Sequence, residues 1–322
     1  MELQQLQINN SNGRADVQSA ANFLGAKTQE IELAEIRDKH IIPVYIKDNE
    51  PVISHYDFIQ STYLAAKDVF EGEVILQPSV RVSHPIKGRI PIARNKPAIE
   101  LLDHEKTLYY ERLAFLIEIP SITQNIGGQA ISLVVGGVKA YNQDNLNVSR
   151  NTGEKFKLFI GFKVQVCTNL CVWSDGFTSD IKVSHLEDLS NNTYRLFRNY
   201  KVQEQLELMQ ELTEYSLREN QFAQLLGRVR MYPYVPKDLK QSIPELLMTE
   251  SQVSKVCAAY FKDKEFGGTD NSITLWNLYN LFTDANKTSY IDTFLERSAN
   301  VSLFIQSIKE SLKLQENHWF LT

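Results

Sequence analysis

The stretch FKLFIGFKVQV, residues 156–166, shows the pattern that decides the fold class of this 322-residue chain. Apolar side chains stand at every second position from Phe156 to Val166. A repeat of two residues is typical of a β-strand with one buried face. Residues 113–119 alternate in the same way, and residues 130–141 are apolar and rich in β-branched side chains. Together the three segments predict an antiparallel meander.

One helix is predicted among these strands, and the chain is predicted to become helical after residue 185. Ser54 and Asp57 have the spacing of a capping box ahead of apolar residues at helical spacing. Beyond His185 the apolar period changes from two to about 3.6 residues, which indicates helices rather than strands. Residues 192–215 are predicted to form one long, charged helix, and further helices follow it.

The predicted fold class is α+β, with an antiparallel sheet-dominated N-terminal half packed with a mainly helical C-terminal half. The chain divides into an N-terminal tail with a short helix (1–36), an α+β sheet region (37–184) and a helical region (185–322). Separable domains are usually joined by an exposed, polar linker. Because no such linker lies near residue 185, we expect the helices to pack on the sheet as one unit.

Composition and charge narrow the classes of function. The 34 Lys and Arg residues are outnumbered by 39 Asp and Glu residues, which argues against a globally basic nucleic-acid binder. Residues 1–12 lack the basic and apolar parts of a secretory signal, and no apolar run approaches the roughly 18 residues of a membrane span. Three cysteines fit a reducing compartment better than a disulfide framework. We therefore expect a cytoplasmic protein without a membrane partner.

Neither the cysteines nor the glycine pairs match a known chemical motif. Cys167 and Cys171 are four residues apart, and a structural zinc site would need a second pair of Cys or His that the sequence lacks. Both thiols are interpreted as small buried apolar groups. The glycine pairs at 127–128 and 136–137 match neither a dinucleotide fingerprint nor a phosphate loop, and they indicate a bulge or tight turn. The sequence assigns no catalytic residue, metal or cofactor.

A local positive charge is the clearest candidate for a site. No acidic residue occurs between Glu73 and Glu100, a range that contains the segment RVSHPIKGRIPIARNKP, residues 81–97. Cationic side chains on a loop rich in Pro and Gly can hold phosphate oxygens, and arginine favours bidentate contacts. The alternative is a solvated loop, or arginines that pair with carboxylates elsewhere. The candidate residues of this segment are Arg81, His84, Lys87, Arg89, Arg94 and Lys96.

A second basic segment contains aromatic residues. Tyr232 follows Arg228 and Arg230 closely, so that tyrosine rings can stack on bases while arginines neutralise phosphates, as in single-strand binders. The alternative is a helix C-terminus, where cations complement the helix dipole and tyrosines pack on the core. The choice depends on whether this segment lies close to the first one.

Three motifs together resemble a known family. They are the loop SHPIKGR (83–89), the strand and turn FKVQVCTNL (162–170) and the helix LWNLYNLFTD (275–284). They resemble the family called domain of unknown function 3871, and more remotely the phage/plasmid-like proteins, over most of the chain from about Ile41 to Phe304. The resemblance implies a mobile-element or prophage context, and it carries no catalytic residues over to this chain.

The leading hypothesis is a non-enzymatic nucleic-acid-associated protein of a mobile element or prophage. It would bind the phosphate backbone of single-stranded DNA or RNA through the basic segment 81–96. One alternative is a protein-interaction module that engages a host or phage protein through the helical half. Another is a metal or thiol enzyme whose site is assembled from residues distant in the sequence.

Overall fold

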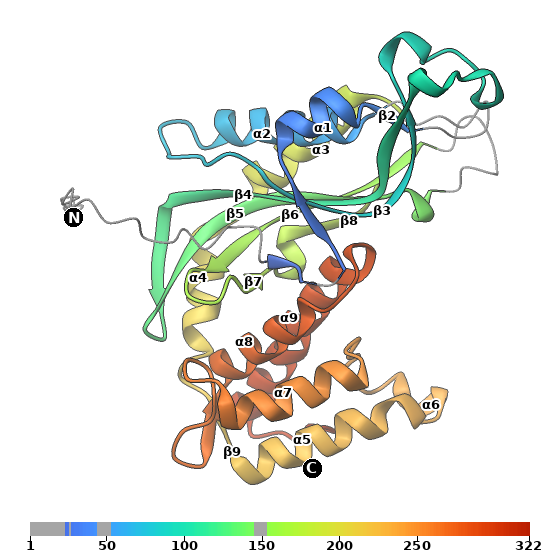
Figure 1. Ribbon diagram of the computed structural model, residues 1–322. Helices are drawn as coiled ribbons and strands as arrows, with labels where there is room; N and C mark the ends of the chain where they lie inside the picture. The colour runs from blue at the N-terminus through green and yellow to red at the C-terminus, as the bar shows by residue number, and fades with distance from the viewer. Residues whose placement is uncertain (1–22, 26, 44–52, 145–152) are drawn as a thin grey trace.

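An antiparallel sheet, eight-stranded in the part of the chain that is described, lies at the centre of the protein (Figure 1). The structure is a computed structural model, and it describes residues 23–25, 27–43, 53–144 and 153–322. The strands are β1 (Gln29–Ile31), β2 (Ile42–Pro43), β3 (Ser79–Arg89), β4 (Lys106–Ile126), β5 (Gln129–Ala140), β6 (Glu154–Val164), β7 (Leu170–Cys171) and β8 (Phe177–Val183). The predicted meander is confirmed, because β4, β5 and β6 pair antiparallel in chain order.

The prediction that β6 buries only one face is wrong. Lys157 and Lys163 lie on the face opposite Phe156 and Phe162, and both lysines are buried as well. Each ammonium group forms an ion pair, Lys157 with Glu296 and Lys163 with Glu118. Buried cations of this kind require such partners. The alternation along the strand therefore separates two buried faces, and one of them carries ion-paired lysines beside apolar residues such as Phe159.

Helices make up most of the rest of the described chain, together with a small two-stranded sheet. The helices are α1 (Leu33–Lys39), α2 (His55–Val69), α3 (Leu186–Asn199), α4 (Val202–Glu211), α5 (Glu219–Met231), α6 (Lys237–Lys240), α7 (Glu250–Lys262), α8 (Leu275–Asn286) and α9 (Ile291–Leu314), and β9 (Ser216–Arg218) pairs with β10 (Ser272–Thr274). The capping box predicted for Ser54 and Asp57 is confirmed at the start of α2. The single helix predicted for 192–215 is wrong, because the chain turns at Tyr200 and Lys201 between α3 and α4.

Different helices cover the two faces of the sheet. In Figure 1, α2 and α3 lie on the upper face, and α8 and α9 lie below. On the upper face the Phe58 ring of α2 meets Phe115 and Phe156 edge to face, with ring centroids 5.0 and 4.8 Å apart. On the lower face a separate apolar cluster joins Phe294 and Leu295 of α9 to Val134, Phe159 and other residues of the sheet. The first half of the chain therefore depends on the second half to cover its sheet.

The two glycine pairs have different roles. The pair at 127–128 forms the tight turn between β4 and β5, where both glycines have positive φ. The pair at 136–137 lies in regular pairing inside β5, so the predicted bulge or turn is wrong there. A Cβ atom on Gly136 would lie 2.1 Å from the carbonyl oxygen of Phe115, and one on Gly137 would lie 2.4 Å from the Phe58 ring. This pair therefore allows the neighbouring strand and α2 to approach β5 closely.

A buried ion cluster joins the end of β5 to the start of β6. The Lys139 ammonium lies 2.6 Å from Asp144 Oδ2 and 3.2 Å from Glu154 Oε2, and all three side chains are buried. The backbone N–H of Lys155 donates to Asp144 Oδ1 at 2.8 Å, and that of Ile53 donates to Glu154 Oε1 at 3.0 Å. The cluster therefore fixes β5, β6 and the approach to α2 together.

Candidate functional site

The loop that joins β3 to β4 projects beyond the sheet, at the upper right of Figure 1. This hairpin loop, residues 90–105, consists of three short 3-10 turns: η2 (Pro91–Ala93), η3 (Ala98–Glu100) and η4 (Asp103–Glu105). Its base is closed by a hydrogen bond of 3.0 Å from the Ile90 N–H to the Glu105 carbonyl. Part of the predicted basic segment therefore lies on β3, and the rest lies on this loop.

Arg89 holds the hairpin loop in shape. Its side chain is fully buried, and its Nη1 atom faces the carbonyl oxygens of Ala93, Arg94 and Lys96 at 3.5, 2.9 and 2.5 Å. Charge-assisted hydrogen bonds to several carbonyls stabilise this loop, which lacks the inter-strand hydrogen bonds of a sheet. The prediction that Arg89 offers its guanidinium to a phosphate is therefore wrong, because the group is inside the loop.

Glu105 holds the same loop from its other end. Its carboxylate is buried, pairs with the Lys96 ammonium, and accepts a hydrogen bond of 2.9 Å from the Leu102 N–H. The hydrogen bond from Lys96, followed by that from Leu102, lowers the pKa of Glu105. Lys96 is therefore already engaged by a carboxylate, as the alternative interpretation of the segment expected.

Two candidate cations remain exposed on this side of the protein. The side chains of Lys87 and Arg94 have no hydrogen-bond or ion-pair partner among the described residues. Arg94 lines a hollow of about 270 Å³ together with Arg37 of α1 and Tyr56 of α2. Arg37 itself pairs with its neighbour Asp38 at 2.7 Å, and both side chains are exposed. Two guanidinium groups, a tyrosine and the carboxylate of Asp57, which Ser54 holds in the capping box, thus border one hollow beside the hairpin loop.

The other two candidates of this segment lie further back along β3. Arg81 donates to Thr28 Oγ1 at 2.7 Å and to the Thr28 carbonyl at 3.2 Å, and burial lowers its pKa. His84 is exposed, and its backbone has φ of 58°. The pairing of β3 with β4 is interrupted there, between the pairs Ser83–Arg112 and Pro85–Tyr110. Eight residues of extended strand span about 25 Å, so Arg81 lies well away from the loop that Arg89 holds. The six candidates therefore do not form one patch.

The second basic segment lies at the opposite end of the molecule, at the C-terminal end of α5 (Figure 1). The Arg228 guanidinium lies 4.9 Å from the centroid of the Trp319 ring and donates to the Thr322 carbonyl at 2.5 Å. Arg230 donates to Ser254 Oγ at 3.2 Å, and the Tyr232 ring packs against Trp319. This arrangement fits the helix C-terminus alternative, because Arg228 and Tyr232 pack residues 319–322 against the end of α5 and Arg230 contacts α7.

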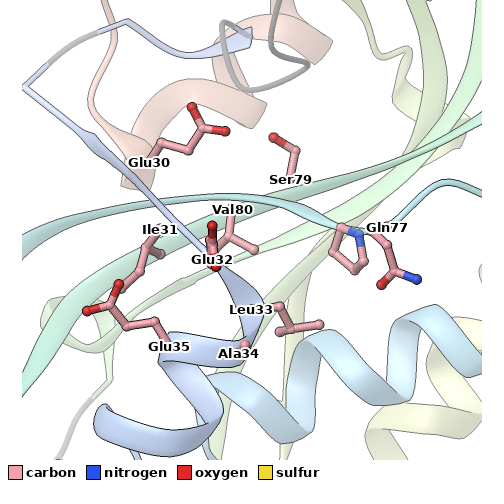
Figure 2. A pocket seen from close by; sticks show the side chains of 10 residues that line it. Glu30, Ile31, Glu32, Leu33, Ala34, Glu35, Gln77, Ser79 and Val80 are labelled. Atoms are coloured by element: carbon pink, nitrogen blue, oxygen red, sulfur yellow. The ribbon is translucent and has the colours of Figure 1, made fainter.

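A second hollow is lined by acidic side chains rather than by cations. It measures about 630 Å³ and lies between β1, α1 and the start of β3. Glu30, Glu32 and Glu35 line it, and Figure 2 shows that they point in different directions rather than toward one common centre. Carboxylates repel phosphate groups. This hollow is therefore unfavourable for a polyanion.

The sequence interpretation missed the apolar side chains of the hairpin loop. Ile92 and Ile99 are 90% and 94% exposed, and Leu102 is 54% exposed. The only signal was the placement of these residues between prolines and charged residues, outside any strand or helix pattern. The interpretation also missed Arg37 and Tyr56, because nothing in the sequence links them to Arg94.

Cys167 and Cys171 do not have the environment of reactive thiols. Burial raises the pKa of Cys167 to about 11, and it raises that of Cys171 further. A nucleophilic cysteine needs a lowered pKa, so both thiols are protonated at neutral pH. Within the described ranges no group of three or more His, Cys, Asp or Glu side chains is placed to hold a metal ion. None of the helices in those ranges has the length and apolar character needed to span a membrane.

The fold and the hairpin loop define a class of α+β protein in which helices cover both faces of an antiparallel sheet and one ordered loop projects from it. Residues 7–321 match the family model described as "Domain of unknown function, B. Theta Gene description (DUF3871)", and the chain therefore belongs to this family. The resemblance predicted for this family is confirmed. No curated protein and no solved structure matches the chain.

Proposed function

We propose that this protein is a non-enzymatic nucleic-acid-associated protein of a mobile element or prophage, that it acts in the cytoplasm, and that its hairpin loop contacts the phosphate backbone. The observation that carries the proposal is the exposure of Lys87 and Arg94, without partners among the described residues, beside a loop that Arg89 and Glu105 hold rigid. Cations on a preorganised loop lose little freedom when they bind. The mobile-element context rests on the remote resemblance to phage/plasmid-like proteins.

The hollow beside the loop supports a phosphate contact. Arg94 and Arg37 both border it, and guanidinium groups bind phosphate in a bidentate manner. The exposed pair of Arg37 with Asp38 contributes little to stability, so Arg37 can exchange this carboxylate for a phosphate. A phosphate in the hollow would then be held from α1 and from the hairpin loop at once.

Changing Lys87 and Arg94 together to Ala is expected to weaken nucleic-acid binding about tenfold at low salt, because two charge-assisted contacts are lost. The slope of log affinity against log salt concentration should fall by about two, since each phosphate contact contributes about one to that slope. Fluorescence anisotropy with labelled single-stranded and duplex oligonucleotides across a salt series measures both quantities.

The matched control changes Lys255 and Lys262 of α7 to Ala. Both lysines are exposed, and the substitution removes the same charge from the helical lobe at the other end of the molecule. This variant should bind as the wild type does. Equal losses in the two variants would mean that binding follows net charge alone, and binding that ignores salt would contradict a phosphate contact.

A protein-interaction function is the second candidate, and a groove between α2 and α3 favours it. The groove measures about 420 Å³ and is lined by Leu64 and Leu186 together with the acidic residues Asp57 and Glu187. Leu64 is 53% exposed and Leu186 is 40% exposed. An apolar groove with an acidic rim suits an amphipathic helix whose polar face is basic.

Changing Leu64 and Leu186 to Asp is expected to abolish capture of such a partner, because both apolar anchors of the groove become charged. The measurement is a pulldown from nuclease-treated native lysate, followed by quantification of the captured protein against the bait. One protein at a one-to-one ratio with the wild type, and none with the variant, is the expected result. A partner that the variant retains would place the interface elsewhere.

A further inference from the structure

The two most exposed large apolar side chains among the described residues both lie in the hairpin loop. Ile99 is 94% exposed and Ile92 is 90% exposed, whereas Ala93 and Leu101 of the same loop are buried. The loop is not loosely attached, because Arg89 and Glu105 bind its backbone from inside. Two almost fully exposed isoleucines on one ordered loop are therefore candidates for contact with a binding partner.

The residue types in this loop favour duplex DNA over single-stranded nucleic acid as its ligand. Proteins that bind single strands stack bases on aromatic rings, but residues 81–108 contain no Phe, Tyr or Trp. Proteins that bend duplex DNA instead insert aliphatic side chains or proline between base steps from the minor groove. Ile92 follows Pro91 directly, and Ile99 lies two residues after Pro97. Residues 81–108 therefore have the chemistry of a wedge rather than that of a stacking platform, and Tyr56 is the aromatic residue that borders the hollow lined by Arg94.

We infer that the hairpin loop inserts Ile92 and Ile99 between base steps of duplex DNA from the minor groove and bends the duplex. Lys87 and Arg94 hold the phosphates that flank the insertion. This inference rests on the proposed function and specifies its ligand as duplex DNA in place of the single strand first expected. Kinking of the duplex offsets the free-energy cost of unstacking the bases, because it brings more of the protein surface into contact with the DNA.

A membrane surface is the other partner that exposed isoleucines and cations can suit. Interfacial anchoring uses a continuous apolar face, usually on an amphipathic helix. In the hairpin loop the two isoleucines are separated in sequence by residues 93–98, which include Arg94 and Lys96. The carboxylate of Glu100 follows the second isoleucine and repels anionic lipid and DNA phosphates alike, so it does not distinguish the two partners. Isolated aliphatic side chains between charged groups favour the DNA wedge.

The test measures DNA bending separately from DNA binding. A short duplex with a flexible TA step at its centre carries a donor and an acceptor dye at its two ends, and energy transfer reports the distance between them. Wild-type protein is expected to raise the transfer by bending the duplex. Changing Ile92 and Ile99 together to Ala should abolish this rise while affinity falls less than about fivefold, because the phosphate contacts remain.

A matched control changes Leu239 of α6 and Leu314 of α9 to Ala, since both are more than half exposed and lie outside the loop. This variant should bend DNA as the wild type does. Because Ile92 and Ile99 contribute little to the core, their variant should keep the wild-type thermal midpoint.

Three results would overturn the inference while leaving the proposed function in place. They are salt-dependent binding without any bending, bending that survives the loss of both isoleucines, and tighter binding to single strands than to duplexes. A failure to bind any nucleic acid would overturn both. Binding of the wild type to phosphatidylserine vesicles, lost in the Ile92 and Ile99 variant and without DNA binding, would assign the loop to a membrane surface instead.

Discussion

Changing Arg89 to Ala is expected to lower the free energy of unfolding by about 3 kcal/mol, because buried hydrogen bonds from a charged donor are lost and a cavity remains. The guanidinium lies against the carbonyls of Ala93, Arg94 and Lys96, so its loss leaves these acceptors without their donor. Urea unfolding measures the change. DNA binding should weaken as well, because the loop that carries Arg94 loses its shape.

Two further variants separate the structural role of Arg89 from direct binding. Changing Arg89 to Lys keeps the charge, but an ammonium group lacks the planar fork of donors, so stability should not be restored. Changing Arg94 to Ala should weaken binding and leave stability unchanged, because its side chain is exposed. If the Ala variant of Arg89 were as stable as the wild type and still lost binding, Arg89 would contact the phosphate itself.

Changing Lys139 to Met is expected to lower the free energy of unfolding by about 3 to 5 kcal/mol, the usual cost of removing one partner from a buried ion pair. Methionine fills much the same volume, so the loss comes from the charge rather than from a cavity. Asp144 and Glu154 would face each other without the ammonium group that lies 2.6 and 3.2 Å from them. Urea unfolding at neutral pH measures the effect.

The control for this prediction is Lys201 changed to Met. Lys201 pairs with Glu204 at 2.8 Å, but both side chains are more than half exposed. Solvent screens such a pair, so its loss should change stability little. Similar effects of the two substitutions would show that burial does not strengthen the Lys139 cluster.

Local patterns identified the meander of β4, β5 and β6 because strand periodicity depends on neighbouring residues only. The apolar repeat of residues 156–166 identified β6, and the capping pair of Ser54 and Asp57 identified the start of α2. The burial of Lys157 was not predictable in this way. Its partner, Glu296, lies on α9, and no periodicity relates two positions so far apart in the chain.

The sequence identified the basic segment, but it did not show which of its cationic side chains are exposed. Arg89 and Arg94 are five positions apart and identical in type, yet one is buried inside the loop and the other is exposed. Arg89 ends β3 and its side chain is enclosed by the loop, whereas Arg94 lies on the loop, which has no regular period that would reveal which of its residues are exposed. The hollow shared by Arg37 and Arg94 likewise depends on tertiary packing.

The lower face of the sheet has a consequence for how the chain is synthesised. Val134 and Phe159 are covered by Phe294 and Leu295, which leave the ribosome long after β5 and β6. Contacts between such distant segments form slowly. A growing chain therefore carries an uncovered apolar surface until α9 emerges, and during that interval it is most vulnerable to aggregation.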